Sequence, residues 1–255
     1  MIAQTWWLTH RQLKALARQP GVLVITLMQP VVWLFLFGNL FRRVVELPGF
    51  GAGSYLDYRV PGIVVMNAVS ANMWAGMTTI DEIERGTLDR FLTTPVARGA
   101  IMNANVIVAA LSTAFQSAVI VLLGWAAGAH YPGGPLGPIT LIVLSMVLGT
   151  VFTALSNAFG MAVRQRESVI GLSIFLLLPL TFLSSAFMAE SLMPGWMRGI
   201  AAANPVDWSL EAARGALAES ADWSATLVRG GWLLALAAAM VWLSTLTFRG
   251  YRRKV

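Results

Sequence analysis

The sequence contains six long apolar stretches that carry no Asp, Glu, Lys, Arg or His. An apolar helix of about 20 residues is long enough to cross the hydrocarbon core of a membrane. A charged side chain at the centre of such a helix would cost about 2.5–3.5 kcal/mol, so the absence of charge is a strong signal. The chain is therefore predicted to be an all-α integral membrane protein with six transmembrane helices, at residues 22–41, 60–80, 101–127, 139–163, 169–188 and 230–248.

The overall composition also indicates a membrane protein. Of the 255 residues, 57% are hydrophobic, and the mean hydropathy is +0.68. Soluble domains are typically about 45–50% apolar, so this chain has too little polar surface for a domain that folds in water. The sequence contains no cysteine, which excludes disulfides, thiol catalysis and sulfur-ligated metals.

Basic residues are unequally divided between the two sides of the predicted topology. Six spans place both termini on one side of the membrane, and that side collects twelve of the 18 Lys and Arg residues. The positive-inside rule makes this side, with both termini, cytoplasmic. A basic inner surface suits anionic lipid, so the net charge of +6 requires no nucleic acid partner.

Residues 1–21 form an amphipathic segment ahead of the first span. On a helical wheel its apolar side chains, Trp6 and Leu13 among them, lie opposite Arg11 and Lys14. Pro20 then interrupts this helix before the apolar stretch begins. We expect residues 1–21 to be a cytoplasmic helix in the membrane interface, and residues 22–255 to form the six-span transmembrane domain.

The long loop between the fifth and sixth spans contains residues that are typical of the ends of short helices. Asn204 is a favourable N-cap, and Pro205 suits the first helical position. Glu211 is spaced to pair with Arg214 on the surface of this helix, and Gly215 is a plausible C-cap. A second short helix is expected just before it. The outer helices are thus assigned the residues Pro194, Trp196, Asn204, Pro205, Glu211 and Arg214.

A dense cluster of charge follows the second span. Six of the ten residues from 81 to 90 are charged, whereas the whole chain is only 12% charged. Such a segment must lie in water or against a polar protein surface. Because it falls on the predicted cytoplasmic side, it is a candidate docking segment for a soluble partner. An ordinary solvated loop is the alternative.

The sequence lacks the residues that most enzyme classes require. Its only lysines are Lys14 and Lys254, and no G-x-x-x-x-G-K-[ST] motif occurs, so the chain cannot hydrolyse ATP by itself. His10 and His130 have too few companions for a zinc site. No ionisable residue falls in mid-span, which weighs against an ion-coupled secondary transporter or a channel. Those two classes, and a non-transport scaffold for an ATPase, stay open as alternatives.

Several short motifs occur in an order that resembles one family of transporters. After the second span, Glu82, Glu84, Thr87, Asp89 and Pro95 resemble an E-x-E-x-x-T-x-[DE] pattern followed by a hydroxyl and proline run. Gln29-Pro30, Met193-Pro194-Gly195-Trp196, Asn204-Pro205 and Glu211-Ala212-Ala213-Arg214-Gly215 resemble signatures of the same group. Nearly end to end, the chain resembles the permease subunits of type-two ABC exporters, which include bacterial daunorubicin-resistance permeases and share an ABCG-like architecture.

This resemblance implies partners and a position in the cell. Two permeases, identical or related, would assemble with two copies of a separate ATPase subunit in the bacterial plasma membrane. The permease itself would hold no cofactor or metal, and ATP and Mg²⁺ would bind to the ATPase. The segment after the second span would be a short coupling helix that contacts the ATPase through Glu82, Glu84, Arg85, Thr87, Asp89, Arg90 and Pro95.

The same resemblance implies a substrate path at the interface between two permeases, lined mainly by the first, second and fifth spans. The side chains expected to line it are Gln29, Trp33, Asn67, Asn72, Phe175 and Phe182. Apolar walls with few amides suit a hydrophobic or amphipathic cargo, such as a drug, an antibiotic, a lipid or a polyketide. The expected function is ATP-driven export of such a compound.

Overall fold

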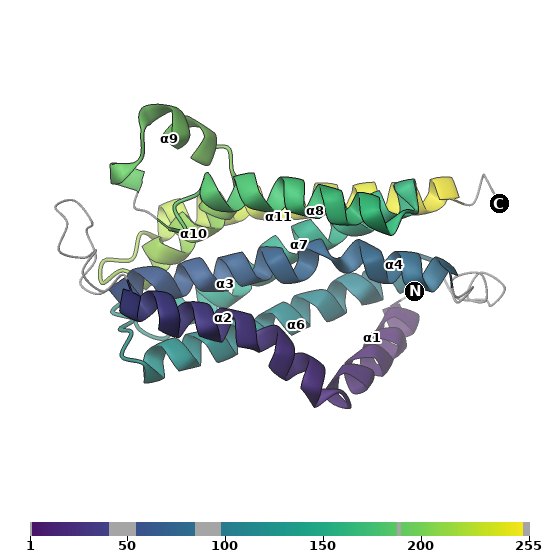
Figure 1. The fold of residues 1–255 in the computed structure, drawn as a ribbon, viewed down its shortest axis with the longest axis horizontal. Coiled ribbons are helices and arrows are strands. Elements are labelled where there is room, and N and C mark those ends of the chain that lie inside the picture. Colours follow the sequence, from purple (N-terminus) through teal and green to yellow (C-terminus); the bar gives the residue numbers. More distant parts are fainter. Residues whose placement is uncertain (1, 41–54, 85–97, 188–189, 252–255) are drawn as a thin grey trace.

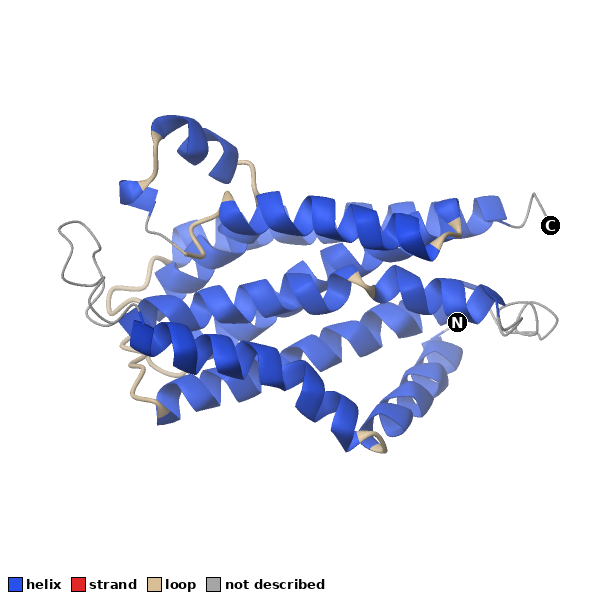
Figure 2. Ribbon diagram, in the orientation of Figure 1, coloured by secondary structure: helices blue, strands red, loops and turns tan. Residues whose placement is uncertain are grey.

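All regular structure in the described part of the chain is helical, as the apolar stretches predict (Figure 2). The computed structural model describes residues 2–40, 55–84, 98–187 and 190–251. The start of α1 (Ile2–Ala17) and the end of α11 (Trp223–Tyr251) lie toward the same end of the bundle, where α4 (Ala75–Glu84) also ends (Figure 1). We call this the terminal end, and the opposite end, which holds α10 (Pro205–Leu217), the loop end.

The long helices confirm the predicted membrane fold. In the described residues, four helical stretches are long and apolar enough to cross a membrane, namely Leu56–Asp81, Asn103–Ala126, Leu136–Val163 and Trp223–Thr247. They coincide with four of the six predicted spans. The first predicted span corresponds to α2 (Pro20–Leu40). The fifth, predicted at residues 169–188, overlaps α8 (Arg166–Phe182), but this helix has only 17 residues and ends at Phe182, where a turn begins. The total of six spans stays a prediction.

Helix α7 (Leu136–Val163) is the central element of the bundle. It packs against α11, α10, α6 (Arg98–Ala126), α3 (Tyr55–Met73) and α4. Its side chains Leu141, Leu148 and Phe152 are almost completely buried. Small residues let α4 approach this helix closely, since a Cβ atom built on Gly160 would lie 2.7 Å from the carbonyl oxygen of Gly76.

Buried amides and hydroxyls join the helices to one another. Asn72 of α3 donates to Thr113 Oγ1 of α6 over 2.8 Å, and Thr153 of α7 donates to Asn72 Oδ1 over 2.8 Å. Thr79 of α4 donates to Asn157 Oδ1 of α7 over 3.0 Å. Because lipid offers no hydrogen-bond partners, such pairs satisfy groups that would otherwise be costly to bury.

The first helix lies across the terminal half of α6. Gln12 Nε2 donates to Asn105 Oδ1 over 2.6 Å, and Thr9 is buried in the same contact. Trp6 points away from the bundle and is 67% exposed. A helix is therefore present where the amphipathic pattern predicts one, and α2 begins at Pro20 as expected. Its location in a membrane interface stays a prediction.

Candidate functional site

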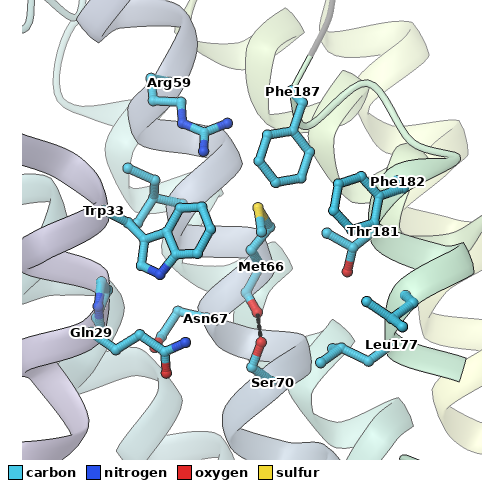
Figure 3. Close-up of a pocket in the computed structure, with 13 residues that line it drawn as sticks. Gln29, Trp33, Arg59, Met66, Asn67, Ser70, Leu177, Thr181, Phe182 and Phe187 are labelled. Carbon is cyan, nitrogen blue, oxygen red and sulfur yellow. Dashed lines mark hydrogen bonds between the residues drawn. The ribbon is translucent and has the colours of Figure 1, made fainter. Parts of the chain in front are cut away.

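A cavity of about 250 Å³ lies between α2, α3, α8 and the segment that follows α8. Its volume is near the lower limit of small-molecule pockets, which is about 300 Å³. Each helix contributes residues three or four positions apart, so that one face of each helix lines the space. Figure 3 shows this arrangement, and the lining residues are Gln29, Pro30, Trp33, Arg59, Ile63, Met66, Asn67, Ser70, Leu177, Leu178, Thr181, Phe182 and Phe187.

The loop end of the cavity is formed by an aromatic cluster and one arginine. The Phe187 ring stacks on the Phe182 ring, with centroids 5.2 Å apart, and meets the Trp33 ring edge-on at 6.4 Å. The Arg59 guanidinium lies over the Phe187 ring, with Cζ 4.5 Å from the centroid. Cation–π contacts of this kind contribute about 0.5–2 kcal/mol, more where water is excluded.

Arg59 is a site residue that the sequence did not reveal. The predicted span starts one residue later, because a charged side chain normally marks the end of an apolar stretch. In the structure α3 begins at Tyr55, and the Arg59 side chain is completely buried. Its Nη1 donates to the carbonyl oxygen of Ala186 over 3.1 Å, which ties α3 to the turn after α8.

That turn is also held from the other side by α10. Asn204 caps α10 by accepting from the Val206 N–H, and its Nδ2 donates to the Leu180 carbonyl oxygen over 2.7 Å. Asp207 Oδ1 accepts from the Ser185 N–H over 2.7 Å. The N-cap predicted at Asn204, with Pro205 in the first turn, is therefore confirmed.

Arg214 fixes the same turn. Its Nη1 and Nη2 donate to the Ser185 hydroxyl and carbonyl oxygens, both over 2.9 Å, and its Cζ lies 3.8 Å from the centroid of the Tyr58 ring. Tyr58 itself donates to the Ser185 carbonyl oxygen over 2.5 Å. The turn that carries Phe187 into the cavity is thus clamped between α3 and α10.

Two sequence predictions for α10 are wrong. Glu211 forms its ion pair with Arg229 of α11, whereas Arg214 points inward to Ser185. The helix continues past Gly215 to Leu217, and its C-cap is Ala218. Gly215 packs beside Thr226 of α11, where a Cβ atom would lie 3.2 Å from the Thr226 hydroxyl.

Glu211 belongs to a small charged cluster at the loop end. Burial raises the pKa of Glu211 to about 7, and a hydrogen bond with Glu190 and the nearby charge of Asp207 act in the same direction. Arg229 opposes this effect by stabilising the carboxylate. The cluster connects the short helical turn at Glu190–Leu192 to α10 and α11. Of the other outer residues, Pro194 precedes α9 (Gly195–Ala201), and Trp196 is exposed on it.

The structure brings four of the six predicted path residues to one cavity. Gln29, Trp33, Asn67 and Phe182 all line it. Asn72 instead lies between α3, α6 and α7. Its Nδ2 donates to the Ala68 carbonyl oxygen and to Thr113 Oγ1, and its Oδ1 accepts from Thr153. Phe175 lies away from the cavity and is 71% exposed.

Most of the predicted coupling residues lie outside the part of the chain that the structure describes. Arg85, Thr87, Asp89, Arg90 and Pro95 lie outside the described residues, as does the side chain of Glu82. Glu84 ends α4 and forms an ion pair with Arg166, the first residue of α8.

The cavity suits an organic ligand more than a metal ion. None of the described residues that line it is a carboxylate, and in the described segments no three His, Asp or Glu side chains gather as metal ligands would. Apolar side chains dominate the walls, while Gln29, Asn67, Ser70 and Thr181 supply neutral polar groups. Such a mixture can hold a molecule that is largely apolar and carries one polar group.

The fold and the cavity define a multi-pass membrane protein with a ligand-sized space among its helices. Residues 3–218 match the ABC-2 type transporter family, and the chain belongs to that family. Members of this family are the permeases of ABC transporters, membrane subunits that work with a separate ATPase. The resemblance indicated by the sequence motifs is confirmed.

Individual relatives agree with this assignment. The chain is 30% identical to the daunorubicin resistance ABC transporter permease protein DrrB1 of Streptomyces coeruleorubidus, over 97% of this chain and 86% of that protein. It is 27% identical to the putative transport permease ycf38 of Cyanophora paradoxa, over 84% and 73% of the two chains. It is 23% identical to the inner membrane transport permease YadH of Escherichia coli K12, over 82% of each.

Proposed function

We propose that this chain is the permease of an exporter that moves an amphipathic compound outward across the bacterial plasma membrane. Two copies of a separate ATPase, with ATP and Mg²⁺, drive it, and a second permease, identical or related, completes the transporter. Both termini lie in the cytoplasm, which makes the terminal end of the bundle the inner end. The name of the relative DrrB1 supports a drug or antibiotic-like cargo.

The cavity between α2, α3 and α8 is the single observation that supports transport most directly. It combines an apolar lining with a few neutral amides and hydroxyls, and it lies among three helices and the turn after α8. A scaffold that only tethers an ATPase has no need for such a space. We assign Gln29, Trp33, Asn67 and Phe182 to the cargo path on this ground.

Coupling to the ATPase is proposed through the end of α4 and the charged residues that follow it. Glu84 marks the beginning of this segment, and the assignment of Glu82, Arg85, Thr87, Asp89, Arg90 and Pro95 to the ATPase contact rests on the sequence motif alone. Because a chain without a P-loop needs an external energy source, a charged docking segment on the inner side agrees with this mechanism.

The proposal is tested in inside-out membrane vesicles that contain the permease and its co-purified ATPase. Daunorubicin is the first probe, and its uptake is followed by fluorescence quenching after addition of ATP. Uptake that requires ATP supports the proposal, and Trp33→Ala should reduce it several-fold because the ring lines the cavity. Phe175→Ala is the matched control, since that ring lies away from the cavity.

Other results would select an alternative function. Uptake driven by a proton gradient without ATP would identify an ion-coupled secondary transporter. An ATPase that binds the permease while no cargo in a broad panel of drugs and lipids is moved would identify a scaffold.

A further inference from the structure

We propose that the cavity recognises its cargo through a hydrogen-bond donor on that cargo, such as a hydroxyl or an amide N–H group. The acceptors are Asn67 and Ser70 on α3, and Gln116 of α6 is a positioning residue that sets the direction of the Asn67 amide. The inference rests on the proposed function for its role in transport. It adds a substrate class and a residue that does not itself line the cavity.

One hydrogen bond from a neighbouring helix orients the Asn67 amide. Asn67 Nδ2 donates to Gln116 Oε1 of α6 over 2.8 Å. Gln116 is only 6% exposed, so its side chain is held among the helices, whereas Asn67 lines the cavity. With the nitrogen turned to α6, Oδ1 is the amide atom of Asn67 that makes no hydrogen bond within the described residues.

Ser70 presents a second acceptor on the same wall. Its hydroxyl donates to the Met66 carbonyl oxygen over 2.8 Å, which uses the only hydrogen of this group. While that bond is intact, the Ser70 oxygen can accept from a ligand but cannot donate to it. Because residues three positions apart lie on one face of a helix, Asn67 and Ser70 line the cavity together (Figure 3).

The other neutral polar side chains of the lining do not select between donors and acceptors. Gln29 carries both an amide oxygen and an NH₂ group, and the Thr181 hydroxyl can either donate or accept. The wall formed by α3 therefore sets the preference. Since apolar side chains such as Ile63 and Leu177 surround these groups, a cargo without a donor leaves the acceptors unmatched in a space of low polarity, which weakens its binding.

A binding experiment on the permease alone tests the inference without the ATPase. The purified chain in lipid nanodiscs is equilibrated with β-naphthol or with β-naphthyl methyl ether, and empty nanodiscs give the background from lipid. The two probes share one ring system, and only the naphthol carries a donor. Wild type should bind β-naphthol about fivefold more tightly than the ether, the effect of one hydrogen bond between neutral groups.

The substitution Gln116→Leu tests the positioning role. Without its partner on α6, the Asn67 amide can turn, and its NH₂ group can then donate to the oxygen of either probe. The preference for β-naphthol should disappear, while the affinity for the ether stays equal or rises. Gln116→Glu keeps an acceptor oxygen beside Asn67 and should retain the preference. Asn67→Leu should abolish it.

The matched control is Asn105→Leu, which removes another amide from α6. Asn105 accepts from Gln12 of α1 and lies about three turns from Gln116 along the helix, so both affinities should stay unchanged. The inference is overturned if wild type binds the two probes equally, if it binds neither, or if Gln116→Leu keeps the preference. It is also overturned if Gln116→Leu weakens both probes alike, because Gln116 would then hold the helices together without orienting Asn67.

The transport function can fail separately. If β-naphthol is preferred in nanodiscs but no compound, daunorubicin included, is taken up with ATP in inside-out vesicles, the acceptor site stands and the proposed export is refuted. If daunorubicin is exported while the two naphthyl probes bind equally, export stands and the acceptor site is refuted.

Discussion

Arg166 Nη2 lies 2.6 Å from Asp81 Oδ1, and the same nitrogen contacts the Glu84 carboxylate. The ion pair joins the first residue of α8 to the end of α4, at the point where the charged segment begins. Further along α8, Thr181 and Phe182 line the cavity. A displacement of the end of α4 can therefore reach the cavity wall along a single helix.

Reversing the charge of Arg166 should uncouple transport from ATP hydrolysis by the partner subunit. Arg166→Glu places a third acid beside Asp81 and Glu84, so the ends of α4 and α8 should repel each other. We expect ATP-driven uptake to fall several-fold while the amount of inserted protein and its melting temperature change little, because the side chain is exposed. Uptake and ATPase activity are measured on the same vesicles.

A double substitution and a neighbouring one are the controls for this ion pair. Glu84→Arg combined with Arg166→Glu restores opposite charges and should recover part of the uptake. Glu167→Lys reverses the next, exposed position on α8 and should have little effect. Full transport by Arg166→Glu would show that the pair plays no part in coupling.

A methyl group at Gly76 should destabilise the bundle. A Cβ atom there would lie 2.3 Å from the carbonyl oxygen of Ser156, so α4 and α7 would have to move apart. The hydrogen bond from Gly76 N–H to Ser156 Oγ, 2.9 Å long, would also weaken. Overpacking of this kind costs about 1–3 kcal/mol, and Gly76→Ala should lower the melting temperature in detergent accordingly.

The matched control is Gly171→Ala in the exposed part of α8. A Cβ atom at Gly171 meets no atom within 4 Å, so the substitution should gain helix propensity and leave stability equal or higher. Equal melting temperatures for the two alanine variants would contradict the close approach of α4 and α7.

The stability of the loop end should depend on pH through Glu211. Its folded pKa is about 7, against an ordinary value of 4.5, because burial disfavours the carboxylate. Between these values the folded protein holds a proton that the unfolded chain has lost, so the free energy of unfolding falls as pH rises toward 7. Since Glu211 is partly exposed, we expect a fall of about 1–2 kcal/mol, not the full shift.

The change is followed as the unfolding midpoint in denaturant at pH 5, 6, 7 and 8. Glu211→Gln stays neutral at every pH and should flatten the profile in this window. Glu219→Gln, which alters an exposed acid just beyond α10, should keep the wild-type slope. A wild-type profile that rises between pH 5 and 7 would refute the raised pKa.

The helices could be predicted from the sequence, because each long apolar run has one stable solution in a bilayer. The N-cap at Asn204 could also be predicted, since capping depends on residues close together in the chain. The ion-pair partner of Glu211, in contrast, could not be predicted from the sequence. Arg214 is correctly spaced for a pair on one helix, but it instead contacts Tyr58 of α3 and Ser185 of the turn after α8, which are distant in the sequence.

Some of the residues that line the cavity could be predicted from the sequence, whereas others depend on how distant segments pack. Gln29, Trp33, Asn67 and Phe182 were predicted as polar or aromatic side chains within spans, and the fold brings them together. Phe175 has the same chemistry but lies nearly two turns away from Phe182 along α8, beyond the cavity. Arg59 was missed because its charge was read as the boundary of a span, whereas its burial and its contact with Phe187 show that it lies inside the protein.

Because α7 lies at the centre of the bundle, substitutions in it should destabilise the fold more than substitutions of exposed residues in the peripheral helices. Helix α7 packs against six other helices, whereas α2 and α8 border the cavity and present exposed apolar side chains such as Met28 and Leu178. Exposed residues on these two helices can be replaced with little loss of stability, unlike buried ones such as Leu34. In the proposed function, substitutions at exposed positions of α2 and α8 would change the lining of the cargo path while the packing around α7 is kept.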